Sequence, residues 1–220
     1  MSTFLNPFSD PDVAAHYEDW YRGPGAVADR LEKRLLGEQL RVSFPDSRTL
    51  LEVGCGTGHF VRWFEEQGLS TVGVDPSAAM LDEANRLGGG RLVRANACAL
   101  PFADRTFDLV ALIATLEFLA DPARAIKEVV RVARRGVLVG ALNRWSVYAL
   151  RRRFGARSVW RQARFFGPYH IQQLLLRAAG RRARNVRWRA VSWSLPPKEK
   201  LLRIPYADFI GVALELSPNP

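Results

Sequence analysis

The first two thirds of the chain alternate between short apolar runs and amphipathic stretches. Five segments, most of them nearly continuous in valine, leucine and isoleucine, are expected to be buried strands: 49–54, 70–75, 90–96, 107–114 and 136–142. Helical periodicity predicts helices between and beside them, at 59–67, 77–86 and 121–134. Strands of this kind that alternate with helices predict an α/β fold, in which a mostly parallel sheet is covered on both faces.

The two ends of the chain follow other patterns. Helices are expected before the first strand and after the fifth, at 11–21, 25–44, 143–155 and 168–179. Two further strands are expected at 185–194 and 207–216, and the proline-containing connection between them is too short for an ordinary crossover helix. The last strand is therefore expected to run antiparallel to its neighbours.

A glycine-rich loop follows the first predicted strand. Gly54, Gly56 and Gly58 lie between that strand and the next helix. Such glycines allow a sharp turn and a close approach of a ligand, which then faces the amides at the helix start. The second strand ends at Asp75, whose carboxylate can accept both hydroxyl groups of a ribose. The alternative for Asp75 is a cap at the strand end.

The spacing of the glycines excludes two common nucleotide sites. A dinucleotide fingerprint needs its third glycine at position 59, where the chain has His59. The chain also contains no P-loop motif. The loop therefore favours an adenosine-type ligand without a pyrophosphate-binding pattern.

Together these motifs resemble the class I S-adenosylmethionine-dependent methyltransferases, and most of all their broad type 11 group. The resemblance rests on LLEVGCGTGHF (50–60), VGVDPSAAML (72–81), RANACALPFADRTFDLV (94–110), ATLEFLADP (114–122) and RRGVLVGALN (134–143). It is close over residues 49–143 and loose elsewhere. It implies a Rossmann-like sheet of seven strands with an antiparallel last strand, S-adenosyl-L-methionine as cofactor, and methyl transfer as the reaction.

The resemblance also assigns cofactor contacts. The methionine end would be lined by Glu52, Gly54, Cys55, Gly56 and Gly58. The ribose would be held by Asp75, with three residues beside the adenine: Pro76, Ser77 and Met80. Met80 as ordinary helix packing is the alternative for that residue.

Two further positions complete the assigned contacts. Asn96 and Ala97 stand where the family usually has Asp-Ala, which binds the adenine amino group. The side-chain carbonyl of Asn96 can still accept that hydrogen bond, although a plain turn residue is the alternative. Thr115 and Leu116 would lie near the sulfonium.

Methyl transfer is an in-line displacement on a cationic sulfonium, so positioning and desolvation are the main tasks of the protein. An acceptor that carries a proton also needs a nearby base. The sequence offers His16 and Tyr17 in the N-terminal helix, Glu117 after the fourth strand, and His170 near the start of helix 168–179. Each of the four can also be purely structural.

Residues that other methyltransferase classes need are missing from this sequence. The stretch after the fourth strand lacks the Asn/Asp-Pro-Pro-aromatic pattern that grips a flipped base, and it lacks a cysteine nucleophile. No cluster of metal ligands is evident. We therefore expect a small-molecule or lipid or quinone-like acceptor. Aromatic residues after the fifth strand would either shape its pocket or form the local core: Trp145, Tyr148, Trp160, Phe165, Phe166 and Tyr169.

Charge distinguishes the two halves of the chain. Residues 1–110 carry 11 basic and 16 acidic side chains, a net charge of −5, whereas residues 111–220 carry 21 and 6, a net charge of +15. There are 28 Arg and only 4 Lys, and no acid occurs from Val129 to Lys198. Three interpretations stay open: RNA binding, contact with a membrane surface, which is favoured over RNA, and arginines that only solvate outer faces.

Composition bounds the remaining possibilities. With 220 residues, 48% of them hydrophobic, the chain can form one domain with a substantial core. We divide it into N-terminal helices or lid (1–45), a cofactor-binding core (46–143), an acceptor-side insert (144–184) and a C-terminal hairpin (185–220). No apolar run of about 18 residues and no signal peptide is evident, so a cytoplasmic enzyme is expected. An RNA-directed enzyme and a non-catalytic cofactor-binding scaffold are the alternatives.

Overall fold

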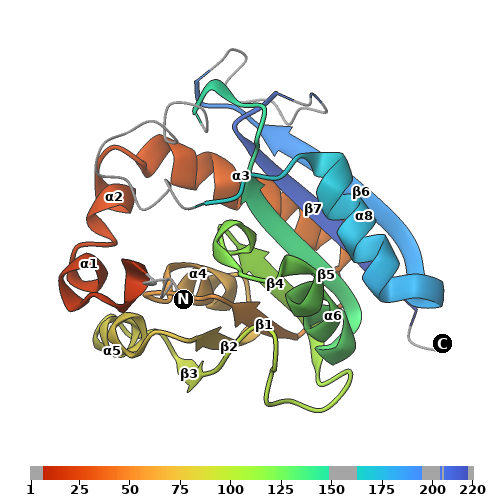
Figure 1. The fold of residues 1–220 in the computed structure, drawn as a ribbon, viewed down its shortest axis with the longest axis horizontal. Coiled ribbons are helices and arrows are strands. Elements are labelled where there is room, and N and C mark those ends of the chain that lie inside the picture. The colour runs from red at the N-terminus through yellow and green to blue at the C-terminus, as the bar shows by residue number, and fades with distance from the viewer. Residues whose placement is uncertain (1–6, 149–162, 195–203, 205, 218–220) are drawn as a thin grey trace, which may run out of the picture.

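A single sheet of seven strands organises the molecule (Figure 1). The computed structural model describes residues 7–148, 163–194, 204 and 206–217. The strand order is β3-β2-β1-β4-β5-β7-β6. The strands are β1 (Thr49–Val53), β2 (Ser70–Asp75), β3 (Arg91–Arg94), β4 (Phe107–Ile113), β5 (Ala133–Leu142), β6 (Ala183–Val191) and β7 (Phe209–Leu216). Only β7 runs antiparallel to its neighbours, β5 and β6, which confirms the predicted topology.

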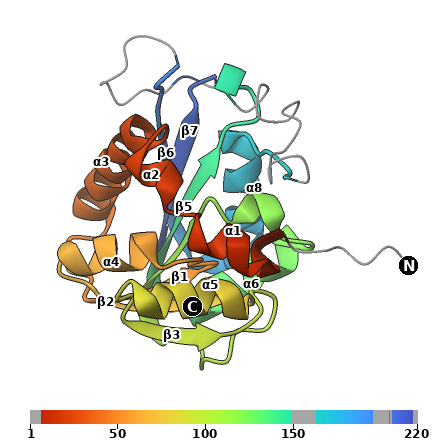
Figure 2. The ribbon, with the colours of Figure 1, turned by 90° about the vertical axis from the view of Figure 1, so that its left-hand side faces the viewer.

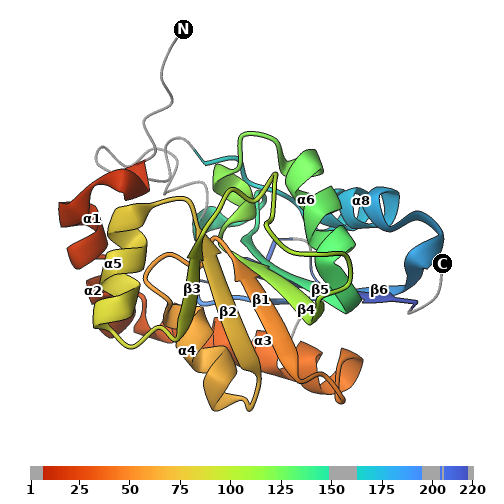
Figure 3. The same ribbon diagram turned by 90° about the horizontal axis from the view of Figure 1, so that it is seen from below.

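Helices cover both faces of the sheet (Figure 3). Helices α3 and α4 pack on one face, and α6 and α8 on the other. This double cover explains why every residue of β4 is buried and why its sequence is almost wholly apolar. The helices are η1 (Pro7–Ser9), α1 (Pro11–Ala15), α2 (Asp19–Arg22), α3 (Ala26–Ser43), α4 (His59–Glu66), α5 (Ala78–Arg86), η2 (Leu116–Phe118), α6 (Pro122–Val132), α8 (Pro168–Ala179) and η4 (Gly180–Arg182).

Most predicted elements are observed within a few residues of their expected ends. Asp121 caps α6 as expected, because its carboxylate accepts a hydrogen bond from the Arg124 amide (3.0 Å). The stretch 143–155 differs from its prediction. Its described part, 143–148, is helical only at its last two residues, and the rest lies outside the described residues, as does Trp160.

The single helix predicted over 11–21 is wrong. The chain forms two short helices instead, α1 beside α5 and α2 beside α3 (Figure 2). The break falls at residues 16–18. Glu18 in this break turns its carboxylate toward the glycine loop, where it accepts from Thr57 Oγ1 (2.9 Å) and Arg62. These tertiary contacts override a helical pattern that is weak over so few residues.

Several described arginines of the basic half are engaged within the fold. Arg131 forms ion pairs with Glu128 and Asp104, both at 2.8 Å, and Arg134 pairs with Asp108. Arg182 donates to the carbonyl oxygens of Val130, Ala133 and Arg134. These arginines thus neutralise nearby acids or satisfy carbonyl groups where α6 meets β5. Among the described residues, no helix is long and apolar enough to cross a membrane.

Candidate active site

The glycine loop and the carboxyl ends of the parallel strands enclose a cavity of about 450 Å³, called the loop cavity below. Open α/β sheets bind their ligands at this end of the strands. Most of the predicted cofactor contacts line it: Glu52, Gly54, Cys55, Gly56, Asp75, Pro76, Met80, Asn96, Ala97 and Thr115. Residues far apart in the sequence are therefore brought together as the motifs predict.

Three predicted contacts lie behind this wall. Leu116 is fully buried in the apolar core. Gly58 begins α4 in a left-handed conformation. Ser77 caps α5 by accepting from the Met80 amide (3.2 Å), and its hydroxyl donates to the Phe8 carbonyl (2.6 Å). None of the three lines the loop cavity, so they support its wall.

Two backbone amides fix the carboxylate of Asp75. Its Oδ2 accepts from the Gly56 amide (3.0 Å), and its Oδ1 accepts from the Ser77 amide (2.8 Å). Burial raises the pKa of Asp75, while these two hydrogen bonds oppose the rise. Because each carboxylate oxygen has two lone pairs, Asp75 can cap the strand end and still accept from a ribose.

Glu52 lies in the same cavity and is 2% exposed. Its Oε2 has no hydrogen-bond partner among the described residues. Burial raises the pKa of Glu52 well above its ordinary value, and the charge of Asp75 adds to the rise. A buried, unpartnered oxygen that faces a cavity is a group for a bound donor to satisfy.

Asn96 forms the turn that the sequence left open as an alternative. Its side-chain oxygen accepts from the Cys98 amide (2.8 Å), and Asn96 pairs with Ala99 across that turn. Asn96 nevertheless lines the cavity, so both interpretations are compatible with the structure. Burial raises the pKa of the Cys55 thiol, which disfavours the thiolate that a nucleophile requires.

A strained turn ends β4 beside the glycine loop. Ala114 has a φ of 51°, which is unfavourable for a residue with a Cβ. The next hydroxyl, Thr115 Oγ1, lies 3.0 Å from the Ile113 carbonyl oxygen and 3.2 Å from that of Gly54. Backbone strain of this kind gathers at functional sites. It marks the place where the resemblance puts the sulfonium.

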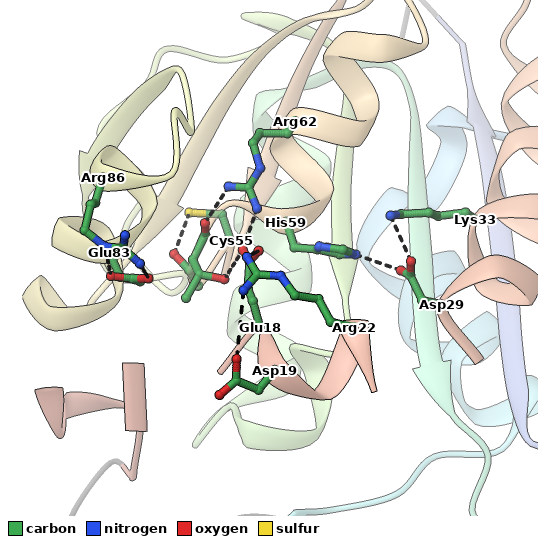
Figure 4. A network of polar contacts seen from close by, with 12 residues as sticks. Glu18, Asp19, Arg22, Asp29, Lys33, Cys55, His59, Arg62, Glu83 and Arg86 are labelled. Atoms are coloured by element: carbon green, nitrogen blue, oxygen red, sulfur yellow. Dashed lines mark hydrogen bonds and ion pairs between the residues drawn. The ribbon is translucent and has the colours of Figure 1, made fainter. Parts of the chain in front are cut away.

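The N-terminal segment (residues 7–22) lies against the loop cavity, and Figure 4 shows Arg62 reaching its Glu18 and His59 reaching Asp29. Glu18 is bonded to Thr57 of the loop and to Arg62 of α4. The His59 ring stacks on Tyr21 with centroids 3.7 Å apart, and its Nε2 lies 2.7 Å from Asp29 Oδ1. Three aromatic residues of this segment line the loop cavity: Phe8, Tyr17 and Tyr21.

A second cavity of about 320 Å³, called the aromatic cavity below, adjoins the first. The two share Tyr17, Tyr21 and Ala114, so the tyrosines stand between them. Its wall is mainly aromatic and apolar: Val13, His16, Tyr17, Trp20, Tyr21, Glu32, Ala114, Leu142, Tyr148, Trp193 and Phe209. Of the aromatic residues predicted for the acceptor side, Tyr148 lies here, whereas Trp145, Phe165 and Phe166 line a separate cleft.

Two of the four predicted catalytic residues line the aromatic cavity. Tyr17 faces both cavities, and its phenol is hydrogen-bonded to that of Tyr21. Burial raises the pKa of Tyr17 to about 12, so it stays a phenol and can donate a hydrogen bond. His16 is exposed at the cavity, with its Nδ1 3.0 Å from the Asp12 carbonyl oxygen.

The other two predicted catalytic residues line neither cavity. Glu117 is 1% exposed, and its Oε1 accepts from the Leu142 amide (2.7 Å), which holds η2 against the end of β5. Burial raises its pKa to about 7. His170 packs on Phe166 and lines the separate cleft of about 870 Å³ together with Arg144 and Arg164. The geometry gives Glu117 a structural contact and leaves His170 apart from the two cavities.

Glu32 is a residue that the sequence reasoning missed. It lies on α3, is 5% exposed and lines the aromatic cavity. The buried face of α3 is otherwise apolar except for Gln39. A helical projection of 25–44 would have shown a carboxyl group within that apolar face.

Known proteins confirm the resemblance. A family model described as a methyltransferase domain matches residues 51–140. An uncharacterized methyltransferase of Mycolicibacterium gilvum is 30% identical over 188 residues, which cover 84% of this chain and 69% of that protein. The chain belongs to the type 11 family of class I S-adenosylmethionine-dependent methyltransferases.

A longer curated relative and a solved structure with the same fold are also similar to this methyltransferase. An uncharacterized methyltransferase of Mycobacterium sp. strain JLS is 37% identical over 134 residues, which cover 60% of this chain and 50% of that protein. The chain thus spans about half the length of several curated relatives it matches. A Thermotoga maritima structure, described as a possible histamine N-methyltransferase, shares the fold with a TM-score of 0.75 at 23% identity, over 93% of this chain and 96% of that one.

The cofactor of this methyltransferase family, S-adenosylmethionine, suits the groups of the loop cavity. Asp75 offers acceptors for ribose hydroxyls, and the unpartnered Oε2 of Glu52 suits an ammonium group. A Cβ on Gly56 would meet nothing closer than Met80 Sδ at 4.0 Å, so the loop leaves open space on the cavity side. These residues would hold the cofactor.

Proposed function

We propose that the chain transfers the methyl group of S-adenosylmethionine to a small, ring-bearing acceptor in the aromatic cavity. One observation supports this most directly: the aromatic cavity adjoins the loop cavity, and Tyr17, Tyr21 and Ala114 are common to both walls. An acceptor in the one and a cofactor in the other would meet at these residues. The strained turn at Ala114 lies at this junction.

The residues of the chain have three tasks in this reaction. When bound, S-adenosylmethionine supplies an electrophilic methyl group on a cationic sulfonium. Glu52 and Asp75 hold the ends of the cofactor site, and the N-terminal segment, fastened through Glu18, excludes water from it. Tyr17 and the aromatic walls orient the acceptor, which raises the rate by positioning. Tyr17 acts as a hydrogen-bond donor, since its raised pKa keeps its proton in place.

A small acceptor suits the cavity better than RNA. Within the described part of the chain, no arginine or lysine lines the aromatic cavity. A phosphate backbone would need such groups. The volume of about 320 Å³ also accommodates a ring-bearing molecule or the head of a quinone-like lipid more readily than a long acyl chain.

Cofactor binding and transfer test the proposal separately. Titration of S-adenosylmethionine into the protein by calorimetry should show binding, and Asp75→Ala should weaken it by about 1.5–3 kcal/mol, because hydrogen bonds to a charged group are lost. Asp82→Ala, an exposed acid on α5 outside the loop cavity, should bind as the parent does. An unchanged affinity in Asp75→Ala would refute the ribose assignment.

Transfer is then followed with tritiated S-adenosylmethionine and a bacterial extract divided into low-molecular-mass solutes, lipids and RNA. Label is expected among the small solutes or extractable quinone-like lipids, and Asp75→Ala should reduce it. Label confined to RNA would overturn the proposed acceptor. An absence of label together with an absence of cofactor binding would overturn the enzyme itself.

A further inference from the structure

Among the described residues, one buried carboxyl group lines the aromatic cavity. Glu32 is 5% exposed and lines the cavity from α3. Among the described residues, no hydrogen bond or ion pair to its side chain is found. A buried acid without a partner is costly to the fold, so its presence in a cavity wall points to a ligand that satisfies it.

The described groups around Glu32 compensate its negative charge only in small part. Asp29 and Glu117 oppose its ionisation, and Lys33 favours it but is paired with Asp29 at 3.0 Å. The other titratable groups of the described cavity wall are the phenols of Tyr17, Tyr21 and Tyr148 and the exposed His16 ring. Within the described residues, the cavity wall thus offers acidic and aromatic groups and no lysine or arginine.

Aromatic rings surround this carboxyl group on several sides. Trp20 and Tyr21 come from α2, Tyr148 and Trp193 from the region beyond β5 and β6, and Phe209 from β7. Faces of tryptophan and tyrosine attract cations, most strongly where water is excluded. A carboxylate within such walls is the chemistry that recognises an organic ammonium group.

We propose that the aromatic cavity selects an acceptor that bears a cationic amine, with Glu32 as its counter-ion and the surrounding rings as its cation–π walls. The proposal rests on the proposed function, because it specifies the acceptor class of the same enzyme. It makes Glu32 a specificity-determining residue for substrate binding. Neutral molecules of the same shape would leave the carboxyl group unsatisfied.

Binding of such an amine is coupled to a proton. Burial raises the pKa of Glu32 to about 8, so at neutral pH the empty cavity holds mainly the neutral acid. An incoming ammonium ion favours the carboxylate, and the carboxyl proton leaves to solvent while the ammonium keeps its own protons. Each binding event therefore releases up to one proton.

The experiment compares phenethylamine with phenethyl alcohol, which has the same ring and chain but no charge. Each is titrated by calorimetry into the full chain, with and without saturating S-adenosylhomocysteine, in two buffers of different ionisation enthalpy. We expect the parent protein to prefer the amine by about tenfold or more, and to release protons with it alone. Glu32→Gln, which keeps the shape, should lose both the preference and the proton release.

Glu38→Gln is the matched control, because Glu38 lies on the same helix outside both cavities. It should keep the preference for the amine. Equal affinities for the two probes in the parent protein, or binding of neither, would overturn the proposal without any variant. A preference that survives in Glu32→Gln would overturn the role of Glu32. S-adenosylhomocysteine is titrated alone, so failure of cofactor binding would be seen separately from failure of amine binding.

Discussion

The two adjoining cavities are built from different parts of the sequence. The loop cavity is formed mainly by short contiguous motifs at the ends of β1, β2, β3 and β4, and backbone amides hold its Asp75. The aromatic cavity is assembled from single residues of segments as distant as Val13, Glu32 and Phe209. A site for a cofactor that is the same throughout a family can be formed by local sequence motifs. A site for an acceptor that varies between family members depends on side chains that the fold brings together. We expect changes in the first to affect cofactor binding and stability together, and changes in the second to separate them.

Gly54→Ala should give the largest effect, in the loop cavity. Gly54 has a φ of 75°, and a Cβ there would lie 2.2 Å from Thr115 Cγ2. Strain and overpacking together should lower the free energy of unfolding by about 2–5 kcal/mol. Urea unfolding measures this loss, and calorimetry should show cofactor binding lost with it.

Gly68→Ala is a control that introduces backbone strain without a steric clash. Gly68 has a φ of 84°, but a Cβ there would meet no atom within 4 Å. It should cost only about 1 kcal/mol and leave cofactor affinity unchanged. Equal losses of unfolding free energy in the two variants would show that the close approach of Gly54 to Thr115 adds no cost beyond the backbone strain.

Glu32→Gln, in the aromatic cavity, should give the second-largest effect on stability, and this effect should depend on pH. The pKa of Glu32 rises from its ordinary 4.5 to about 8 in the folded chain, through burial and the charges of Asp29 and Glu117. Between these values the folded state holds a proton that the unfolded state has lost. The parent protein should therefore lose stability as pH rises from about 5 to about 8, and Glu32→Gln should lose less.

Urea unfolding across this range measures the difference. At about pH 8, Glu32→Gln should be more stable than the parent by about 1–3 kcal/mol, and near pH 5 the two should be similar. Glu52 and Glu117, whose pKa values are also raised, are present in both proteins. The difference in stability between the two proteins therefore reports the ionisation of Glu32. A constant difference at all pH values would mean that Glu32 does not change its protonation on unfolding.

The same contrast explains what the sequence could predict. The strands, the antiparallel β7 and most of the loop cavity follow from local patterns, since burial on both faces and glycine spacing leave few alternatives. The break between α1 and α2 could not be predicted, because it depends on Glu18 reaching Thr57. Glu32 could be found only by asking which face of α3 is buried. His170 was grouped with the site by sequence position, yet the fold places it in another cleft.

The smallest expected effect lies where the N-terminal segment joins the loop cavity. Glu18 is bonded to Thr57 and Arg62, and its side chain is 12% exposed. Glu18→Ala removes both contacts and should weaken the closure by about 1 kcal/mol. The cofactor should then dissociate severalfold faster, as stopped-flow measurements can show, while its association rate changes little.

Asp19→Ala provides the control for that closure. Asp19 is the next residue, its side chain is 62% exposed, and its ion pair with Arg22 spans 3.9 Å within the same short helix. Removing this charge leaves the contacts of Glu18 intact, so cofactor dissociation should match that of the parent. If both variants accelerate dissociation equally, the segment closes through its overall charge and not through the bonds of Glu18. If neither does, the aromatic contacts of Tyr17 and Tyr21 hold it closed without Glu18.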